Sequence, residues 1–312
     1  MSQSFSRRLA EQVCAKGNPA LIGIDPHLHL LPSALQVPDD LAAQADAVAA
    51  FCRGIIDVVA PLVPALKFQM AFFEMLGPEG MRVLAECVAH ARRYDALVIL
   101  DGKRNDIGST AVAYAKGLLG GPDDSVWNGD ALTVNPYLGG DSLQPFVDVC
   151  TERNCGIFVL VKTSNPGGGM FQDLLADGRP IYAHVAAEVE RLAAETAAAA
   201  GSEDRFGAVG AVVGATYPAQ LSELRDAMPH AWFLVPGFGS QGGTARDVAG
   251  AFFDDGLGAI VNSSRGVLFA FRRKEFAEFG EARWQEAAEA AAREMIDQLR
   301  TDTPAGRLTT DR

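Results

Sequence analysis

The sequence predicts an α/β protein, a single-domain (β/α)8 TIM barrel with extra helices at both ends. Eight short apolar runs recur along the 312 residues, and helical stretches lie between them. Runs that are apolar at nearly every position are typical of strands buried on both faces of a parallel sheet. Eightfold alternation of strand and helix favours a barrel, whose usual size is roughly 250 residues. A doubly wound open sheet is the main competing fold, because it uses the same alternation.

The eight predicted strands are rich in β-branched residues, and each is followed by Gly, Pro, Asp or Asn, which are residues that favour turns. In chain order they cover residues 20–25, 63–68, 97–102, 131–135, 156–163, 209–215, 232–237 and 258–264.

Helices are predicted most clearly at residues 39–59, 73–93 and 181–201, the last of them rich in alanine and ending at a glycine. A helix near 3–16 and a closing helix near 281–300 account for the length beyond an ordinary barrel. No linker divides the chain. We therefore expect one domain over residues 1–300 and a flexible tail over residues 301–312.

The composition restricts the possible partners. A net charge of −12 and a pI near 4.9 argue against binding to nucleic acid or to an anionic membrane, since both need a basic face. No apolar run reaches the roughly 18 residues of a membrane span, and the first twenty residues lack the apolar core of a signal peptide. The five cysteines are odd in number and form no CxxC pair, as in a reduced cytosolic protein. A cytoplasmic protein is expected.

A charged cluster follows the third predicted strand, in the stretch LDGKRNDI at residues 100–107. Asp101 and Lys103 are two positions apart, so on an extended chain their side chains point the same way, and Lys67 on the preceding strand can lie beside them. Asp106 begins the loop that follows. Such a cluster could be a salt-bridge network closing the barrel, but buried charges of this density also occur at catalytic sites.

One catalytic interpretation is decarboxylation without a cofactor. Two carboxylates about 4 Å apart repel each other by roughly 4 kcal/mol at an effective dielectric constant near 20. That repulsion disappears when the carboxylate of a substrate leaves as CO2, and a neighbouring lysine could protonate the carbanion that remains.

The same stretch resembles the orotidine 5′-phosphate decarboxylase family, whose pattern is DxKxxDI with a threonine three residues later. The matching residues here are Asp101, Lys103, Asp106, Ile107 and Thr110. The resemblance covers about residues 20–270, and the stretches KFQMAFFE and VKTSNPGG are most similar to the longer bacterial branch of the family.

The resemblance implies conversion of orotidine 5′-phosphate to uridine 5′-phosphate (UMP) and CO2, the last step of de novo UMP synthesis, with no cofactor and no metal. Lys67, Asp101, Lys103 and Asp106 correspond to the family's catalytic array, with Lys103 as the proton donor. It further implies that Asp25 in LIGIDP binds the ribose.

The resemblance also implies a homodimer that shares its active sites. In such a dimer Asp106 and Thr110 would reach into the site of the neighbouring subunit. The partners expected from these features are a nucleotide substrate and a second copy of the chain.

Two glycine-rich stretches, PGFGSQGG at 236–243 and NSSRG at 262–266, follow the last two predicted strands, where barrels often hold a phosphate. We expect open backbone N–H groups at Gly239, Gly242 and Gly243. Arg265 supplies a cation suited to a phosphate dianion.

The family resemblance assigns further residues at this end of the site. It pairs Arg265 with the phosphate, Gln241 with phosphate and pyrimidine, and Ser164 with the pyrimidine ring. Residues 163–173, TSNPGGGMFQD, are glycine-rich enough to form a lid.

Several other interpretations stay open. A related Mg²⁺-dependent sugar-phosphate enzyme, such as a hexulose-phosphate synthase or ketogulonate-phosphate decarboxylase, has the same DxKxxD, and a non-catalytic nucleotide-binding barrel would tolerate loss of the proton donor. A Schiff-base aldolase is disfavoured, since two carboxylates would keep Lys103 protonated.

Three local motifs carry less weight. GFGSQG also matches a dinucleotide-binding GxGxxG, but too little chain follows it for that fold. His27 and His29 have the spacing of metal ligands without an obvious third partner, and Asn135, which begins a turn, could line the pocket or cap the next helix.

Overall fold

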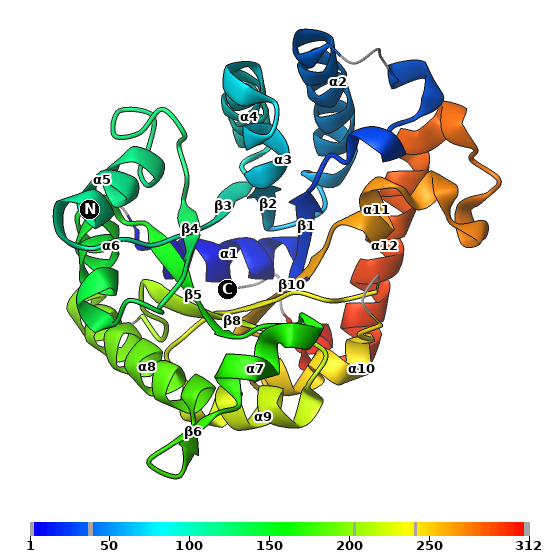
Figure 1. Cartoon of the computed structure of the whole chain (residues 1–312). Helices are drawn as coiled ribbons and strands as arrows, with labels where there is room; N and C mark the ends of the chain where they lie inside the picture. The colour runs from blue at the N-terminus through cyan, green and yellow to red at the C-terminus, as the bar shows by residue number, and fades with distance from the viewer. Residues whose placement is uncertain (1–2, 37–39, 202–203, 240–241, 309–312) are drawn as a thin grey trace.

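A computed structural model of the chain describes residues 3–36, 40–201, 204–239 and 242–308. Eight parallel strands close into a barrel in the order β1-β10-β9-β8-β5-β4-β3-β2, so the predicted (β/α)8 fold is confirmed and the open sheet is excluded (Figure 1). Each predicted run overlaps one of these strands, although β2 and β3 extend beyond the predicted ends at residues 68 and 102. The strands are β1 (Ala20–Ile24), β2 (Ala65–Gln69), β3 (Leu97–Arg104), β4 (Ala131–Val134), β5 (Gly156–Lys162), β8 (Val209–Val213), β9 (Phe233–Val235) and β10 (Ala259–Ser263).

A ring of helices surrounds the barrel (Figure 1). The α-helices are α1 (Phe5–Lys16), α2 (Leu41–Val59), α3 (Ala71–Glu74), α4 (Gly77–Ala91), α5 (Gly108–Leu118), α6 (Gly140–Arg153), α7 (Gly169–Gln172), α8 (Ile181–Ala200), α9 (Pro218–Ala227), α10 (Ala245–Val248), α11 (Arg265–Leu268) and α12 (Trp284–Asp302). The loop after β5 also contains a small antiparallel hairpin, β6 (Leu175–Ala176) with β7 (Arg179–Pro180).

The single helix predicted at residues 73–93 is divided in the structure. Gly77 has a φ of +63°, which interrupts the helical path, and Pro78 then occupies the first turn of α4, where a missing N–H costs nothing. The predicted helices at 39–59 and 181–201 correspond to α2 and α8.

The N-terminal helix α1 closes the barrel at the amino ends of the strands. Phe5, Leu9 and Val13 are buried in a cluster inside the barrel, and the Phe5 ring meets Phe158 edge-on with 6.0 Å between ring centroids. Arg8 anchors the helix through a 2.6 Å ion pair with the buried Asp130. Because this end is filled by side chains, a ligand can enter the barrel only at the carboxyl ends of the strands.

The C-terminal part of the described chain is helical beyond residue 300. Helix α12 extends to Asp302, and residues Pro304–Arg307 form a short 3-10 helix in which Ala305 is buried. The tail expected over 301–312 therefore begins with ordered residues, and its last four lie outside the described part. All five cysteines are buried and none forms a disulfide, and no helix in the described ranges is long and apolar enough to cross a membrane.

Candidate active site

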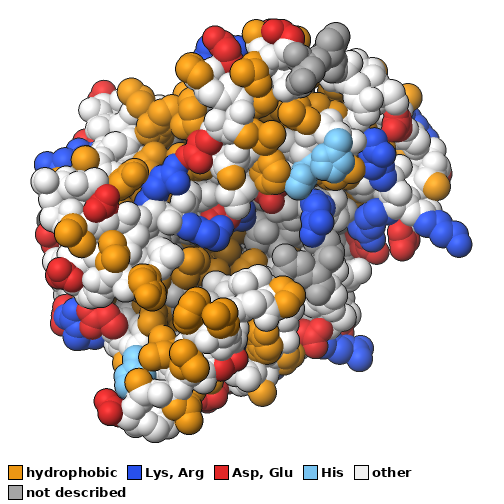
Figure 2. All heavy atoms as spheres, in the orientation of Figure 1, with side chains coloured by type: hydrophobic (Ala, Val, Ile, Leu, Met, Phe, Trp, Pro, Cys, Tyr) orange, Lys and Arg blue, Asp and Glu red, His pale blue; other side chains and the backbone are white. Residues whose placement is uncertain are grey.

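A pocket of about 670 Å³ opens at the carboxyl ends of the strands, the end of the barrel opposite α1. Figure 2 shows it as a hollow in the barrel mouth with charged side chains on its wall. Six of the predicted site residues line this one pocket, although they come from five segments that are far apart in the sequence. They are Asp25, Lys67, Asp101, Lys103, Ser164 and Arg265.

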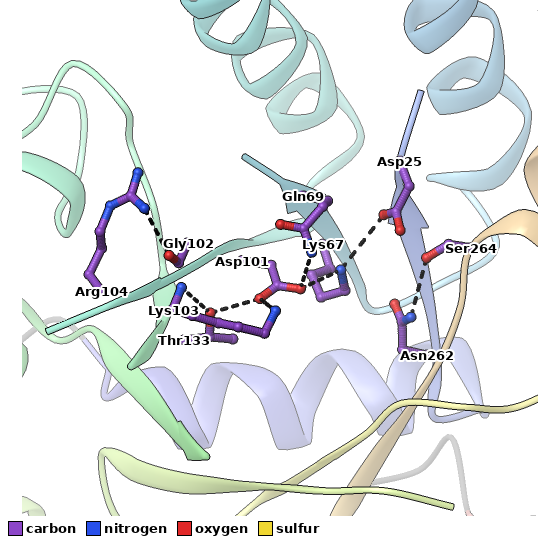
Figure 3. A network of polar contacts seen from close by, with 10 residues as sticks. All are labelled: Asp25, Lys67, Gln69, Asp101, Gly102, Lys103, Arg104, Thr133, Asn262 and Ser264. Carbon is purple, nitrogen blue, oxygen red and sulfur yellow. Dashed lines mark hydrogen bonds and ion pairs between the residues drawn. The ribbon is translucent and has the colours of Figure 1, made fainter. Parts of the chain in front are cut away.

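The Asp101 carboxylate is the centre of the charged cluster, and it accepts four hydrogen bonds (Figure 3). Lys67 Nζ and Gln69 Nε2 donate to its Oδ2, each at 2.9 Å. Lys103 Nζ donates to Oδ1 at 2.7 Å, and the Thr133 hydroxyl donates to the same oxygen at 2.8 Å. The carboxylate is thereby held in one orientation with both oxygens occupied.

The charges of this cluster stabilise one another. Burial by itself would raise the pKa of Asp101, but the adjacent Lys67 and Lys103 outweigh it and hold that pKa well below its usual range. Burial would likewise lower the pKa of Lys67, and the charges of Asp101 and Asp25 raise it above its usual value instead. At neutral pH the site therefore contains a buried carboxylate anion and a buried ammonium.

A β-bulge places Lys103. The register between β3 and β4 shifts between Leu100 and Arg104, and Lys103 adopts a left-handed backbone with φ of +46°. Thr133 of β4 stabilises this conformation, because its hydroxyl oxygen accepts the Lys103 backbone N–H at 2.9 Å. The Lys103 side chain is 47% exposed, whereas Lys67 is only 4% exposed. Lys103 is thus the lysine of the pair that a ligand and water can both reach.

Arg265 also lines the pocket, from the start of α11, which follows β10. Within the described ranges its side chain makes no ion pair and no hydrogen bond, so its charge is available to an anion. Gln241 lies outside the described residues.

The glycines of the neighbouring loop differ from expectation. The N–H groups of Gly239, Gly242 and Gly243 donate to carbonyl oxygens of Gly243, Gly239 and Gly237, so in this conformation the loop itself uses them. The positive φ angles of Gly239 and Gly242 allow this internal turn.

Asp106 and Thr110 do not line the pocket of their own chain. Asp106 Oδ1 accepts the N–H of the following Ile107, and Thr110 is exposed on α5.

Asn135 accepts the backbone N–H of Tyr137 and so shapes a turn outside the pocket. His27 packs 4.3 Å from the Phe72 ring and 5.6 Å from the His29 ring, centroid to centroid. In the described part of the chain, no group of three or more His, Cys, Asp or Glu side chains could hold a metal ion.

Gln69, Thr133 and Asn262 also line the pocket, and the sequence analysis missed them. Two have a recognisable position: Gln69 follows Lys67 by two residues and pairs with Asp101 in the parallel register of β2 and β3. Asn262 belongs to the NSSRG stretch. Its Oδ1 and the Oδ1 of Asp25 are buried without a hydrogen-bond donor among the described residues.

Comparisons with known proteins agree with this geometry. The sequence model of the orotidine 5′-phosphate decarboxylase / HUMPS family matches residues 33–278. Orotidine 5′-phosphate decarboxylase of Rhodopirellula baltica is 53% identical over 305 residues, covering 95% of this chain and 99% of its own. The Deinococcus radiodurans enzyme of the same name is 41% identical over 270 residues, covering 86% and 91%.

Solved structures show the same relationship. The Leishmania donovani OMP decarboxylase is 32% identical with a TM-score of 0.73, covering 96% of this chain and 99% of its own. A relative from Streptomyces avermitilis is 36% identical with a TM-score of 0.79, and 96% of each chain is covered. With this identity over nearly its whole length, the chain belongs to the orotidine 5′-phosphate decarboxylase family.

Proposed function

We propose that the protein decarboxylates orotidine 5′-phosphate to UMP and CO2, with Asp101 destabilising the substrate carboxylate and Lys103 donating the proton. The observation that carries the proposal is the pairing of the buried Asp101 carboxylate with the ammonium of the half-exposed Lys103, 2.7 Å away in one pocket. A cytoplasmic location belongs to the same proposal and is supported by five buried cysteines that form no disulfide.

The electrostatics favour loss of CO2. A substrate carboxylate about 4 Å from Asp101 would be repelled by roughly 4 kcal/mol at an effective dielectric constant near 20. Protonation of Asp101 would relieve this repulsion, but the charges of Lys67 and Lys103 oppose it, because they hold the Asp101 pKa well below its usual range. When the carbon–carbon bond breaks, its electron pair stays on the ring carbon and the repelled group departs as neutral CO2. The interaction therefore favours the transition state over the bound substrate.

Lys103 then completes the reaction. Its ammonium transfers one proton to the carbanion, which becomes the C–H of the product, and the resulting neutral amine regains a proton from solvent through its exposed side. The anchored backbone of Lys103 limits where its ammonium can go, so the proton donor is in position before the carbanion forms.

The remaining pocket residues suit the rest of a nucleotide. Among the described residues, Asn262 Oδ1 accepts no hydrogen bond, and Asp25 Oδ1 lies 3.7 Å from the Lys67 ammonium, beyond hydrogen-bond distance; ribose hydroxyls would satisfy both oxygens. The free cation of Arg265 suits the phosphate, and Ser164 lines the wall where the pyrimidine would lie. Gln241 is proposed to join phosphate and pyrimidine.

The Mg²⁺-dependent sugar-phosphate enzymes are the second candidate, because the matched family model includes them by name. They need a metal-binding carboxylate near the end of the second strand. Here that position is Lys67, whose ammonium bonds to Asp101 at 2.9 Å and lies 3.7 Å from Asp25. A cation is therefore already supplied by the chain, which favours the decarboxylase.

The proposal includes a homodimer with shared sites. Asp106 and Thr110 do not line their own pocket, and exposed apolar side chains occur on the β3–α5 and β4–α6 loops: Ile107 is 58% exposed and Tyr137 85%. A second copy of the chain could cover these apolar side chains. A second copy covering them would bring its Asp106 toward the Lys103 of this chain.

Lys103→Ala should lower kcat by roughly 10²–10⁴-fold, because it removes the proton donor. Arg265→Ala should instead raise KM by about 10- to 100-fold, the loss of a charge-assisted hydrogen bond of about 1.5–3 kcal/mol. The decrease in absorbance of the orotate ring measures both. Activity of both variants equal to that of the parent would refute the assignment.

Thr133→Val keeps the shape of the side chain but leaves the Lys103 N–H without its acceptor and Asp101 without one donor. An unsatisfied buried group costs about 1–3 kcal/mol, so we expect kcat to fall about 10- to 100-fold with little change in KM. Thr133→Ser, which keeps the hydroxyl, is the matched control. Equal kcat values for the two variants would show that the hydroxyl does not position the donor.

Removal of divalent metals should leave turnover unchanged. Protein treated with EDTA and separated from it by gel filtration is assayed with and without added Mg²⁺. We expect equal rates, since Lys67 and Lys103 supply the positive charge at the reacting carbon. A loss of activity that Mg²⁺ restores would favour the sugar-phosphate enzymes.

Mixing two inactive variants tests the shared site. A hybrid of Lys103→Ala and Asp106→Ala subunits contains one site with both native residues, so random reassortment should restore about a quarter of the parental activity. Recovery is measured after the mixed subunits have exchanged. No recovery from an exchanged mixture would place Asp106 outside the neighbouring site.

A further inference from the structure

Lys162, at the end of β5, is a buried lysine that the proposed chemistry does not use. It is 1% exposed and does not line the pocket. The register between β5 and β8 shifts between Leu160 and Lys162. Leu160 faces the pocket, and this irregularity turns Lys162 out of it, as bulges beside active sites often do.

The surroundings of Lys162 compensate its charge. Its ammonium lies 4.7 Å from the ring centroid of Tyr217 and 5.2 Å from that of Tyr182, and it forms an ion pair with Asp173. A buried ammonium is costly without a counter-charge, and Asp173 is the only carboxylate with which it pairs in the described ranges. Asp173 belongs to the loop that follows β5, so this loop supplies the charge that makes a buried Lys162 tolerable.

A second contact joins the ends of the same loop, between Thr163 and Gln172, which are the neighbours of Lys162 and Asp173 in the sequence. Gln172 Oε1 accepts the backbone N–H of Thr163 at 3.0 Å, and Gln172 Nε2 donates to the Thr163 hydroxyl at 2.8 Å. The adjacent pairs Lys162–Asp173 and Thr163–Gln172 therefore join the two ends of segment 164–171. Ser164 and Phe171, at the two ends of that segment, both line the pocket.

The glycines of the segment pack against these contacts. A Cβ on Gly169 would lie 2.6 Å from Asp173 Oδ2, and one on Gly168 would lie 3.0 Å from Thr163 Oγ1. Both have ordinary negative φ values, so left-handed geometry does not require glycine there. The run of glycines leaves room for the two contacts instead of serving only as a flexible hinge.

We propose that Lys162 is a positioning residue for pyrimidine recognition: its ion pair with Asp173, closed in by Tyr182 and Tyr217, fixes the base of the β5 loop and presents Ser164 and Phe171 to the substrate ring. The proposal rests on the decarboxylase function proposed above. It gives the loop an anchored base, so that movement is restricted to residues 164–171.

The test compares two ligands that differ by the base. UMP contains the pyrimidine, and ribose 5-phosphate lacks it but retains the parts that Asp25 and Arg265 would bind. Lys162→Met and Asp173→Asn should each weaken UMP binding about tenfold, as expected for a displaced loop, and leave ribose 5-phosphate binding unchanged. The double variant should bind UMP with an affinity no lower than that of the more affected single variant, because both substitutions break the same interaction.

Asp177→Asn is the matched control, since it removes a charge from the same loop at an exposed turn without touching Lys162. It should bind both ligands as the parent does. Asp173 is half-exposed, so Asp173→Asn decides the question if Lys162→Met fails to fold.

Unchanged UMP binding in Asp173→Asn, or equal weakening of UMP and ribose 5-phosphate, would overturn the positioning role. Turnover of orotidine 5′-phosphate by the parent protein tests the proposed function separately. A parent that turns over substrate together with variants of unchanged UMP affinity would refute the role of Lys162 alone.

Discussion

The carboxylate of Asp101 is the constraint around which the site is arranged. An anion this deeply buried is stable only with its donors in place, and these come from three neighbouring strands: Lys67 and Gln69 from β2, Lys103 from β3 and Thr133 from β4. The barrel register brings these strand ends together at the same height. The same bonds that stabilise the anion in the free protein also prevent it from becoming protonated when a second carboxylate approaches.

The strands could be predicted because a barrel strand is buried along its whole length and therefore reads as a continuous apolar run. The charged residues at their ends could be predicted as candidate site residues because a buried lysine such as Lys67 is costly in an apolar run unless other groups compensate its charge. Thr133 could not, since a single threonine in a strand is an ordinary β-former until its hydroxyl is seen between Asp101 and the backbone of Lys103.

Backbone irregularities account for most of what the sequence left undetermined. A bulge changes which way a side chain points, but it has no recognisable signature in the sequence. Neither the left-handed backbone conformation of Lys103 nor the turn of Lys162 out of the pocket could therefore be predicted. Gly242 and Gly243 were expected to present open amides, but a glycine tolerates many turns, and here the turn closes on itself. The roles proposed for Asp106 and Thr110 depend on a second chain, and a single sequence suggests such roles only through resemblance to a family.

The closure of the barrel by α1 determines how the substrate enters the active site and how the products leave it. Because Phe5, Leu9 and Val13 fill the far end of the barrel, the described residues leave the active site open to solvent at the carboxyl ends of the strands. Orotidine 5′-phosphate enters and UMP departs by the same route, so a departing nucleotide blocks the next arrival until it has cleared the mouth. Of the substrate and the two products, only carbon dioxide is small and uncharged enough to leave while a nucleotide is still bound there.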